Sequence, residues 1–157
     1  MPLTLEHDRP AAATAAEAPR EYVYAHDVCF RETNVVGNVY FANFLEWQGR
    51  CREMFLRDHA PDLLRRIEDG LRLVTLSVGA EFFEELHAFD RVEVRMSLAH
   101  RRGNRVAVRF GYWRVGDGAP RLVARGTQEI GIMQAGTGGL TPVPVPDSLA
   151  DALELYS

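Results

Sequence analysis

Residues 30–53 read FRETNVVGNVYFANFLEWQGRCRE, and this stretch decides the fold. Its first part is polar and contains a glycine, so we predict a loop that leads into a helix. Asn38 is a suitable N-cap residue, because its side chain can accept a hydrogen bond from a free N–H of the first helical turn. The helix is predicted to run from about Val39 to Arg57.

The predicted helix has two chemically different faces. At about 100° per residue, four charged residues fall on one side: Glu46, Arg50, Glu53 and Arg57. The opposite arc is apolar except for one glutamine: Phe41, Phe44, Leu45, Gln48, Phe55 and Leu56. Such a helix is stable only when its apolar arc packs on another apolar surface.

Five segments show the alternation of apolar and polar residues that is typical of half-buried strands. They are residues 22–30, 74–83, 92–98, 106–112 and 122–133. Gly103 and Asn104 predict a hairpin between the third and fourth of them. We therefore predict an α+β fold, in which a five-stranded antiparallel sheet wraps around a long central helix and buries the apolar faces of both.

The chain length of 157 residues fits one domain. Residues 1–20 are predicted to be a disordered tail and residues 21–135 the folded domain. Residues 136–157 begin with a proline-rich run, and we expect a linker and a short helical tail. A short second helix is expected at about 61–69, ending at Gly70.

Composition excludes several classes of protein. A net charge of −4 argues against a protein that binds nucleic acid or an anionic membrane. Two cysteines, Cys29 and Cys51, cannot build a disulfide framework, and the histidines lack the spacing of metal ligands. The N-terminus lacks the apolar stretch of a secretory signal peptide. We expect a cytoplasmic protein with free thiols, no metal and no other cofactor.

Arg52 is out of place on the predicted helix. It projects within about 20° of Leu45, on the apolar arc and away from the charged face. A charge there must be paired or must serve a ligand, because burial of an unpaired charge is costly. Its partner therefore comes from the sheet, a second subunit or a ligand. A purely structural arginine, paired with a core group or extended to the rim, is the alternative.

Asn34 and His26 are further polar residues near the helix. Asn34 lies in the loop before the helix N-terminus, where free backbone N–H groups collect. It is also a residue type that turns favour for their own geometry. His26 lies on the inward face of the first strand, and we predict a buried, hydrogen-bonded histidine.

Residues 30–53 resemble the hot-dog thioesterases of the 4-hydroxybenzoyl-CoA thioesterase type, which carry a D-T-D-x-x-G-x-V-Y-H-x-N-Y stretch before the long helix. Within that superfamily they are most similar to the thioesterases of enediyne polyketide biosynthesis. The resemblance is carried by residues 32–34, 37–40, 43 and 47–53. It implies a hot-dog fold and a homodimer or homotetramer.

Three positions depart from the general family pattern. Asn34 stands where the family has a catalytic aspartate, Phe41 where some relatives have a histidine, and Gly49 where many carry a glutamate. The enediyne group is similar in using asparagine at the first position. An asparagine takes no proton at neutral pH, so it orients water or donates to an oxyanion instead of acting as a base.

The resemblance implies hydrolysis of a thioester that joins a linear polyene, with a β-keto or β-hydroxy group, to an acyl carrier protein. A β-keto acid product would then lose CO₂. In this scheme Asn34 positions water, the backbone N–H of Phe41 holds the thioester oxyanion, and Arg52 holds the β-oxygen or the developing carboxylate. We expect further substrate contacts from six residues: Gly37, Asn38, Tyr40, Phe44, Leu45 and Gln48.

Two alternatives stay open at this point: a general acyl-CoA thioesterase, and an acyl-binding module without catalysis. A carrier protein is usually acidic, so its docking needs a local basic patch. The turn with Arg101, Arg102 and Arg105 is the candidate.

Overall fold

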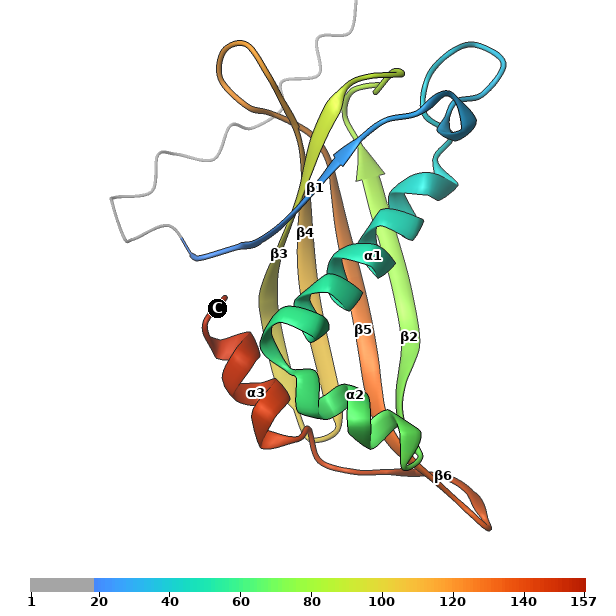
Figure 1. The fold of residues 1–157 in the computed structure, drawn as a ribbon, viewed down its shortest axis with the longest axis vertical. Coiled ribbons are helices and arrows are strands. Elements are labelled where there is room, and N and C mark those ends of the chain that lie inside the picture. The colour runs from blue at the N-terminus through green and yellow to red at the C-terminus, as the bar shows by residue number, and fades with distance from the viewer. Residues whose placement is uncertain (1–18) are drawn as a thin grey trace, which may run out of the picture.

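The computed structural model describes residues 19–157. The predicted tail, residues 1–20, therefore lies outside the described residues except for its last two. From Arg20 onward the chain forms one antiparallel sheet and three α-helices (Figure 1).

The sheet has the strand order β1-β3-β4-β5-β2, with the short β6 added to the end of β5. Its strands are β1 (Tyr22–Asp27), β2 (Leu71–Phe82), β3 (Arg91–Arg102), β4 (Arg105–Val115), β5 (Arg121–Gly136) and β6 (Gly139–Pro142). All pairings are antiparallel. The predicted five-stranded hot-dog sheet is confirmed. Strand β5 continues to Gly136, beyond the end that we predicted at residue 133. β6 follows it directly and pairs back on this additional part.

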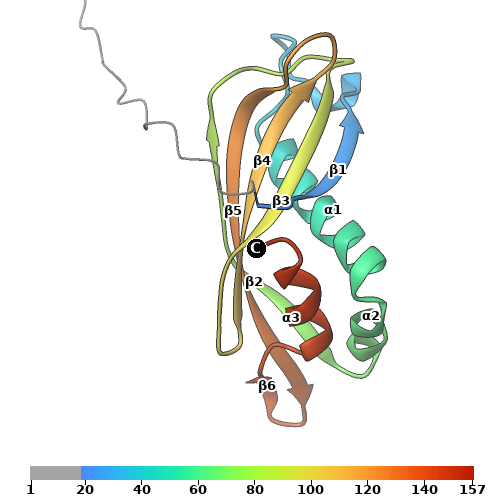
Figure 2. The same cartoon turned by 90° about the vertical axis from the view of Figure 1, so that its left-hand side faces the viewer.

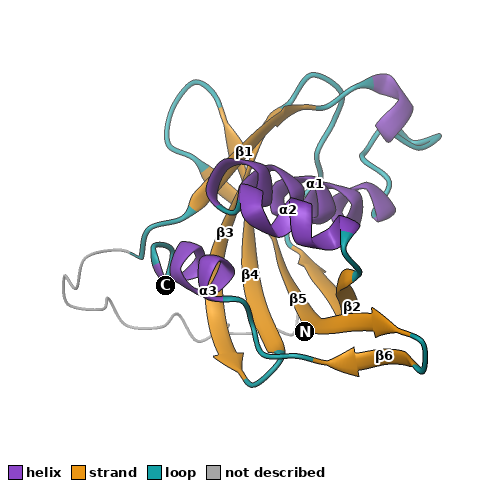
Figure 3. Ribbon diagram, turned by 60° about the horizontal axis from the view of Figure 1, so that its bottom comes forward, coloured by secondary structure: helices purple, strands orange, loops and turns teal. Residues whose placement is uncertain are grey.

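The helices lie together on one face of the curved sheet, and residues 19–157 place no helix on the opposite face (Figures 2 and 3). They are α1 (Ala42–His59), α2 (Pro61–Glu68) and α3 (Asp147–Glu154), preceded by a short 3₁₀ turn, η1 (Phe30–Glu32). The long helix α1 crosses the sheet diagonally. It starts three residues later than predicted, because the N–H of Val39 donates to the carbonyl of Leu86 at 2.7 Å and ties that residue to the loop before β3. Phe41, and not Asn38, is its N-cap.

The inner face of α1 consists of Phe44, Trp47, Gln48, Cys51, Phe55 and Leu56. The sheet meets it with buried valines, aromatic residues and Met96 from the central strands. Of the predicted apolar arc, Phe41 is exposed and Leu45 is half-buried. Trp47 and Cys51 take their places in the core, so the buried face of α1 is rotated from the predicted arc. The charged side of α1 faces solvent, where Glu46 and Arg50 form an exposed ion pair at 2.6 Å.

Residues 136–157 contribute a helix to the core of the domain. The expected short helix is present as α3, and Leu149, Ala150, Ala152 and Leu153 of this helix are buried in the same core as α1. The hydroxyl of Tyr156 lies 2.8 Å from Nε2 of His59, and the backbone carbonyl of Tyr156 accepts the N–H of Leu98. The C-terminal segment is thus a structural part of the domain.

We predict that Leu153→Ala lowers the free energy of unfolding by about 2–5 kcal/mol, because it leaves a cavity under α3. Leu155→Ala is the control on the same segment: that side chain is half exposed, so the change should stay within about 0.5 kcal/mol. Urea unfolding of both variants measures the difference. Equal small losses would mean that α3 contributes little to the fold.

Candidate functional site

The loop that joins η1 to α1, residues 33–41, is a tight hairpin-like turn. Its residues Thr33 and Val39 form a β-bridge, and the N–H of Asn34 donates to the carbonyl of Asn38 at 2.9 Å. Gly37 closes the turn with φ = 92°, a left-handed conformation that favours glycine. This glycine was predicted as a substrate contact, and the structure gives it a conformational role.

Asn34 presents its side-chain amide in a fixed orientation. Its Oδ1 accepts the N–H of Val36 at 3.0 Å. Nδ2 of the same amide has no hydrogen-bond partner among the described residues. Asn34 therefore offers a neutral donor, and it cannot serve as a base.

The start of α1 supplies a second donor. The N–H groups of the first helical turn have no carbonyl four residues before them. The carbonyl of Phe41 accepts the N–H of Phe44, whereas the N–H of Phe41 donates to no backbone carbonyl in residues 19–157. Two donors, the Asn34 amide and this N–H, thus belong to one loop, as the oxyanion scheme requires.

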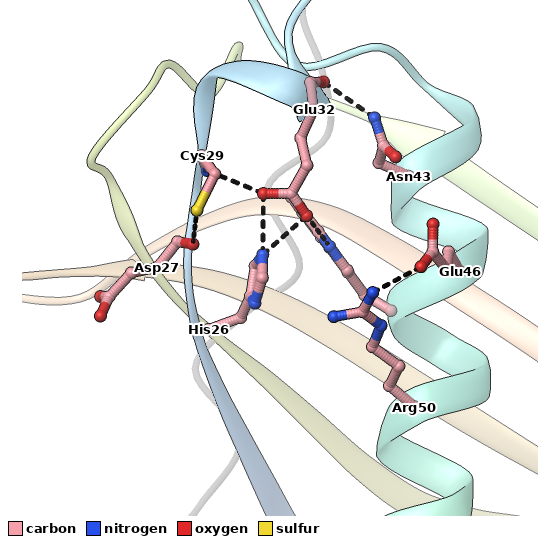
Figure 4. Close-up of polar contacts among 8 residues, drawn as sticks. His26, Asp27, Cys29, Glu32, Asn43, Glu46 and Arg50 are labelled. Carbon is pink, nitrogen blue, oxygen red and sulfur yellow. Dashed lines mark hydrogen bonds and ion pairs between the residues drawn. The ribbon is translucent and has the colours of Figure 1, made fainter.

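A buried carboxylate lies directly beneath this loop (Figure 4). Glu32 is only 7% exposed. Its Oε1 accepts a hydrogen bond from Nε1 of Trp47 at 2.9 Å, and its Oε2 accepts one from the N–H of Cys29 at 2.8 Å. Both oxygens lie within 2.9 Å of Nε2 of His26. His26 is hydrogen-bonded as predicted, but it is partly buried and not fully buried as we expected.

Burial by itself would raise the pKa of the Glu32 carboxyl, but the hydrogen bonds from Cys29, His26 and Trp47 outweigh it and hold this pKa below its ordinary value. A carboxylate with a lowered pKa is a weak base. Glu32 belongs to the sequence motif of the loop, but we did not predict a role for it. The available signal was the inward-facing His26, which needed a polar partner in the core.

Arg52 reaches the sheet, as one of the predicted possibilities required. Its Nη1 donates to Oγ1 of Thr75 on β2 at 3.1 Å and to Oε1 of Gln128 on β5 at 3.2 Å. Its Nε is buried without a partner. Burial lowers the pKa of this guanidinium, although an arginine remains charged at neutral pH. Both partners are neutral, and no carboxylate among residues 19–157 forms an ion pair with Arg52.

One chain does not bring Arg52 and Asn34 together. Arg52 lies ten residues into α1, which is about 15 Å along the helix axis from Ala42. The thioester oxygen and the β-oxygen of one substrate are only a few bonds apart. Arg52 and the Asn34 loop of one chain therefore lie at different heights along α1.

The other predicted contacts divide into two groups. Tyr40 is exposed, Leu45 is half-buried, and Asn38 donates through Nδ2 to Oε1 of Glu85 at 3.2 Å. Phe44 and Gln48 are instead core residues.

Gln48 connects α1 directly to the sheet. Its Nε2 donates to the carbonyl of Gly79 at 3.0 Å, while its Oε1 is buried without a partner. A Cβ at Gly126 would lie 2.2 Å from Nε2 of Gln48, so a larger residue there would displace the Gln48 amide.

A narrow apolar space lies next to Arg52, between α1, the sheet and α3. Its walls include Phe55, Leu73, Met96, Ile130 and Leu149. Among residues 19–157, no group of three or more acidic, histidine or cysteine side chains is placed to hold a metal ion. No helix in this part of the chain is long and apolar enough to cross a membrane.

Comparison with known proteins gives consistent matches. The model of the thioesterase-like superfamily matches residues 28–153. The crystal structure of the dynemicin thioesterase, solved in a study of polyene binding, shares 51% identity, covers 87% of this chain and 96% of its own, and superposes with a TM-score of 0.84. No curated protein sequence matches significantly.

Two more distant structures share the fold. A 4-hydroxybenzoyl-CoA thioesterase mutant bound to 4-hydroxybenzoyl-CoA is 20% identical, covers 88% of this chain and 99% of its own, and has a TM-score of 0.74. The 1,4-dihydroxy-2-naphthoyl-CoA thioesterase from Synechocystis is also 20% identical, covers 85% and 95%, and has a TM-score of 0.76.

We predict that Arg52→Met leaves the free energy of unfolding within about 1–2 kcal/mol of wild type, because relief of a desolvated charge offsets two lost hydrogen bonds to neutral groups. Arg50→Met, which removes an exposed pair with Glu46, is the control and should cost about 0.5 kcal/mol or less. Urea unfolding measures both. A loss of about 3–5 kcal/mol at Arg52 would instead reveal a carboxylate partner in the assembled protein.

A second prediction concerns acid. Glu32 faces one titratable side chain, His26 from β1, and two neutral donors, the N–H of Cys29 before η1 and Nε1 of Trp47 on α1. Because the folded-state pKa of Glu32 is lowered, its stabilisation is present above the ordinary glutamate pKa and is lost as the pH falls through the folded value. The stability gap between wild type and Glu32→Gln should therefore be largest near pH 7 and shrink below about pH 4. Urea unfolding across this range tests it, and a gap independent of pH would contradict it.

Proposed function

This chain belongs to the thioesterase-like superfamily, and from that membership we propose that it releases a linear polyene chain from an acyl carrier protein in enediyne biosynthesis. The observation that carries the proposal is the 51% identity with the dynemicin thioesterase over nearly the whole of both chains. The more distant CoA thioesterases support only the fold.

The proposed reaction is hydrolysis without a carboxylate base. Water attacks the thioester carbonyl carbon, the carbon–sulfur bond breaks, and the carrier thiol leaves with a proton. The N–H of Phe41 and the free amide hydrogens of Asn34 stabilise the oxyanion or hold the water. A β-keto acid product then loses CO₂ and becomes a methyl ketone.

We further propose that two copies share each site. One edge of β2 has no strand partner among the described residues, and Leu76, Val78 and Phe82 are exposed along it. Antiparallel pairing of two β2 edges would cover this strand. It would also bring Arg52, which is bound to Thr75 of one copy, towards the Phe82 end of the other.

That arrangement would complete the site. Phe82 packs on Phe44 in the first turn of α1, close to the donors of the 33–41 loop. Arg52 of one copy would then face the Asn34 loop of its partner and hold the β-oxygen of the substrate. The polyene chain would enter the apolar space beside Arg52, which must widen to admit it.

We also propose that the chain acts on an acyl carrier protein and that it does so in the cytoplasm. Cys29 and Cys51 are free thiols, as a reducing compartment would keep them. The candidate docking turn keeps less positive charge than its sequence indicates, because Arg101 pairs with Glu154 and Arg105 with Glu129. Arg102 is its remaining candidate for a carrier contact.

The test compares one polyene chain on two carriers. We expect wild type to release the chain from a loaded carrier protein with a higher kcat/KM than from the CoA thioester. Asn34→Ala should lower kcat by about 100- to 1,000-fold, the effect of one lost donor to a transition state, and leave the oligomeric state unchanged. Mass spectrometry identifies the products. Equal rates on both carriers would favour a general acyl-CoA thioesterase, and tight binding without release would favour an acyl-binding module.

A further inference from the structure

The side chain of Glu32 connects three of the segments around the 33–41 loop. Its carboxylate joins β1 through His26, the residue before η1 through the N–H of Cys29, and α1 through Trp47. Trp47 is fully buried, so this anchor is part of the core. Figure 4 shows the carboxylate between the strand and the helix.

The main chain of the same residue holds the far end of the loop. The carbonyl of Glu32 accepts the N–H of Tyr40 at 2.9 Å and Nδ2 of Asn43 at 2.8 Å. Hydrogen bonds at Glu32 and Tyr40 thus hold both ends of residues 33–39 together, and Asn34 lies within this segment.

We propose that Glu32 is a positioning residue of the thioester site: it clamps the 33–41 loop to β1 and α1 and thereby fixes the Asn34 amide and the Phe41 N–H relative to each other. This inference rests on the proposed thioesterase function.

Glu32 acts through the loop and not on the substrate. Its oxygens are occupied by three donors and the side chain is 10% exposed, so no acyl group reaches it. A group of this kind sets the geometry of donors. A displacement of about 1 Å at such donors costs up to about 100-fold in rate.

The clamp requires a carboxylate and not merely a side chain of that shape. Trp47 offers an N–H to Oε1 and Cys29 offers one to Oε2. A carboxylate accepts at both oxygens, whereas glutamine has one carbonyl and one NH₂ group. Whichever way a glutamine at this position turns, its NH₂ faces one of these two donors.

The experiment measures kcat and KM of Glu32→Gln on an acyl N-acetylcysteamine thioester at 25 °C, with the thermal midpoint measured beside them. We expect kcat to fall about 10- to 100-fold and KM to stay within about twofold, since the acyl chain binds elsewhere. Asn43→Ala, which removes one contact to the Glu32 carbonyl and leaves the buried carboxylate intact, should change kcat in the same direction by a smaller factor.

Glu85→Gln is the matched control. Glu85 accepts a hydrogen bond from Asn38 of the same loop, but its side chain is exposed, so kcat should not change. Amide hydrogen exchange provides a readout that does not depend on activity. In Glu32→Gln the amides of Asn34, Gly37 and Val39 should exchange faster than in wild type.

Wild-type kcat in Glu32→Gln would overturn the inference, and so would a reduced kcat with unchanged exchange across residues 33–41. A wild-type protein that hydrolyses no acyl thioester would instead refute the proposed function. Hydrogen exchange alone would then decide whether the clamp exists.

Discussion

The structure depends on the burial of one face of α1 against the concave side of the sheet. Trp47, Cys51 and Phe55 are almost completely buried on that face. Strands β1 and β3 contribute partners to them: His26 packs on Trp47, Tyr22 on Phe55, and Cys51 lies against the carbonyl of Val94. This packing fixes the helix axis diagonally across the sheet. Because the 33–41 loop enters one end of α1 and Arg52 lies three turns along it, the same contact sets the positions of all proposed catalytic groups.

Polar groups within this interface are matched by specific partners. The carboxylate of Glu32 has three donors, and the hydroxyl of Tyr112 donates to the carbonyl of Phe44 at 2.7 Å. There are two exceptions. Oε1 of Gln48 is buried without a partner, and Arg52 has only neutral partners and a buried Nε without one. A satisfied network holds a fold in one arrangement, whereas an uncompensated cation attracts an anionic group. The interface thus contains both a fixed part and a part that is suited to a ligand.

Sequence reasoning predicted the helix, the five main strands and the unusual position of Arg52, because each depends on local periodicity. It placed the start of α1 too early, since the contact of Val39 with Leu86 joins residues far apart in sequence. The predicted buried face of the helix was also rotated from the observed one. Periodicity does not take account of the hydrogen bond from Trp47 to Glu32, which helps to hold Trp47 in the core. The role of Glu32 was not predictable from spacing, as its donors come from three separate elements.

The two cysteines differ in a way that has practical value for spectroscopy. Burial raises the pKa of the Cys51 thiol to about 12 and keeps it out of contact with reagents, whereas Cys29 is exposed. A maleimide dye or spin label would therefore attach to the natural chain at one position, with no engineered cysteine. That position adjoins η1, so the label would report motion at the base of the 33–41 loop in the unmodified sequence.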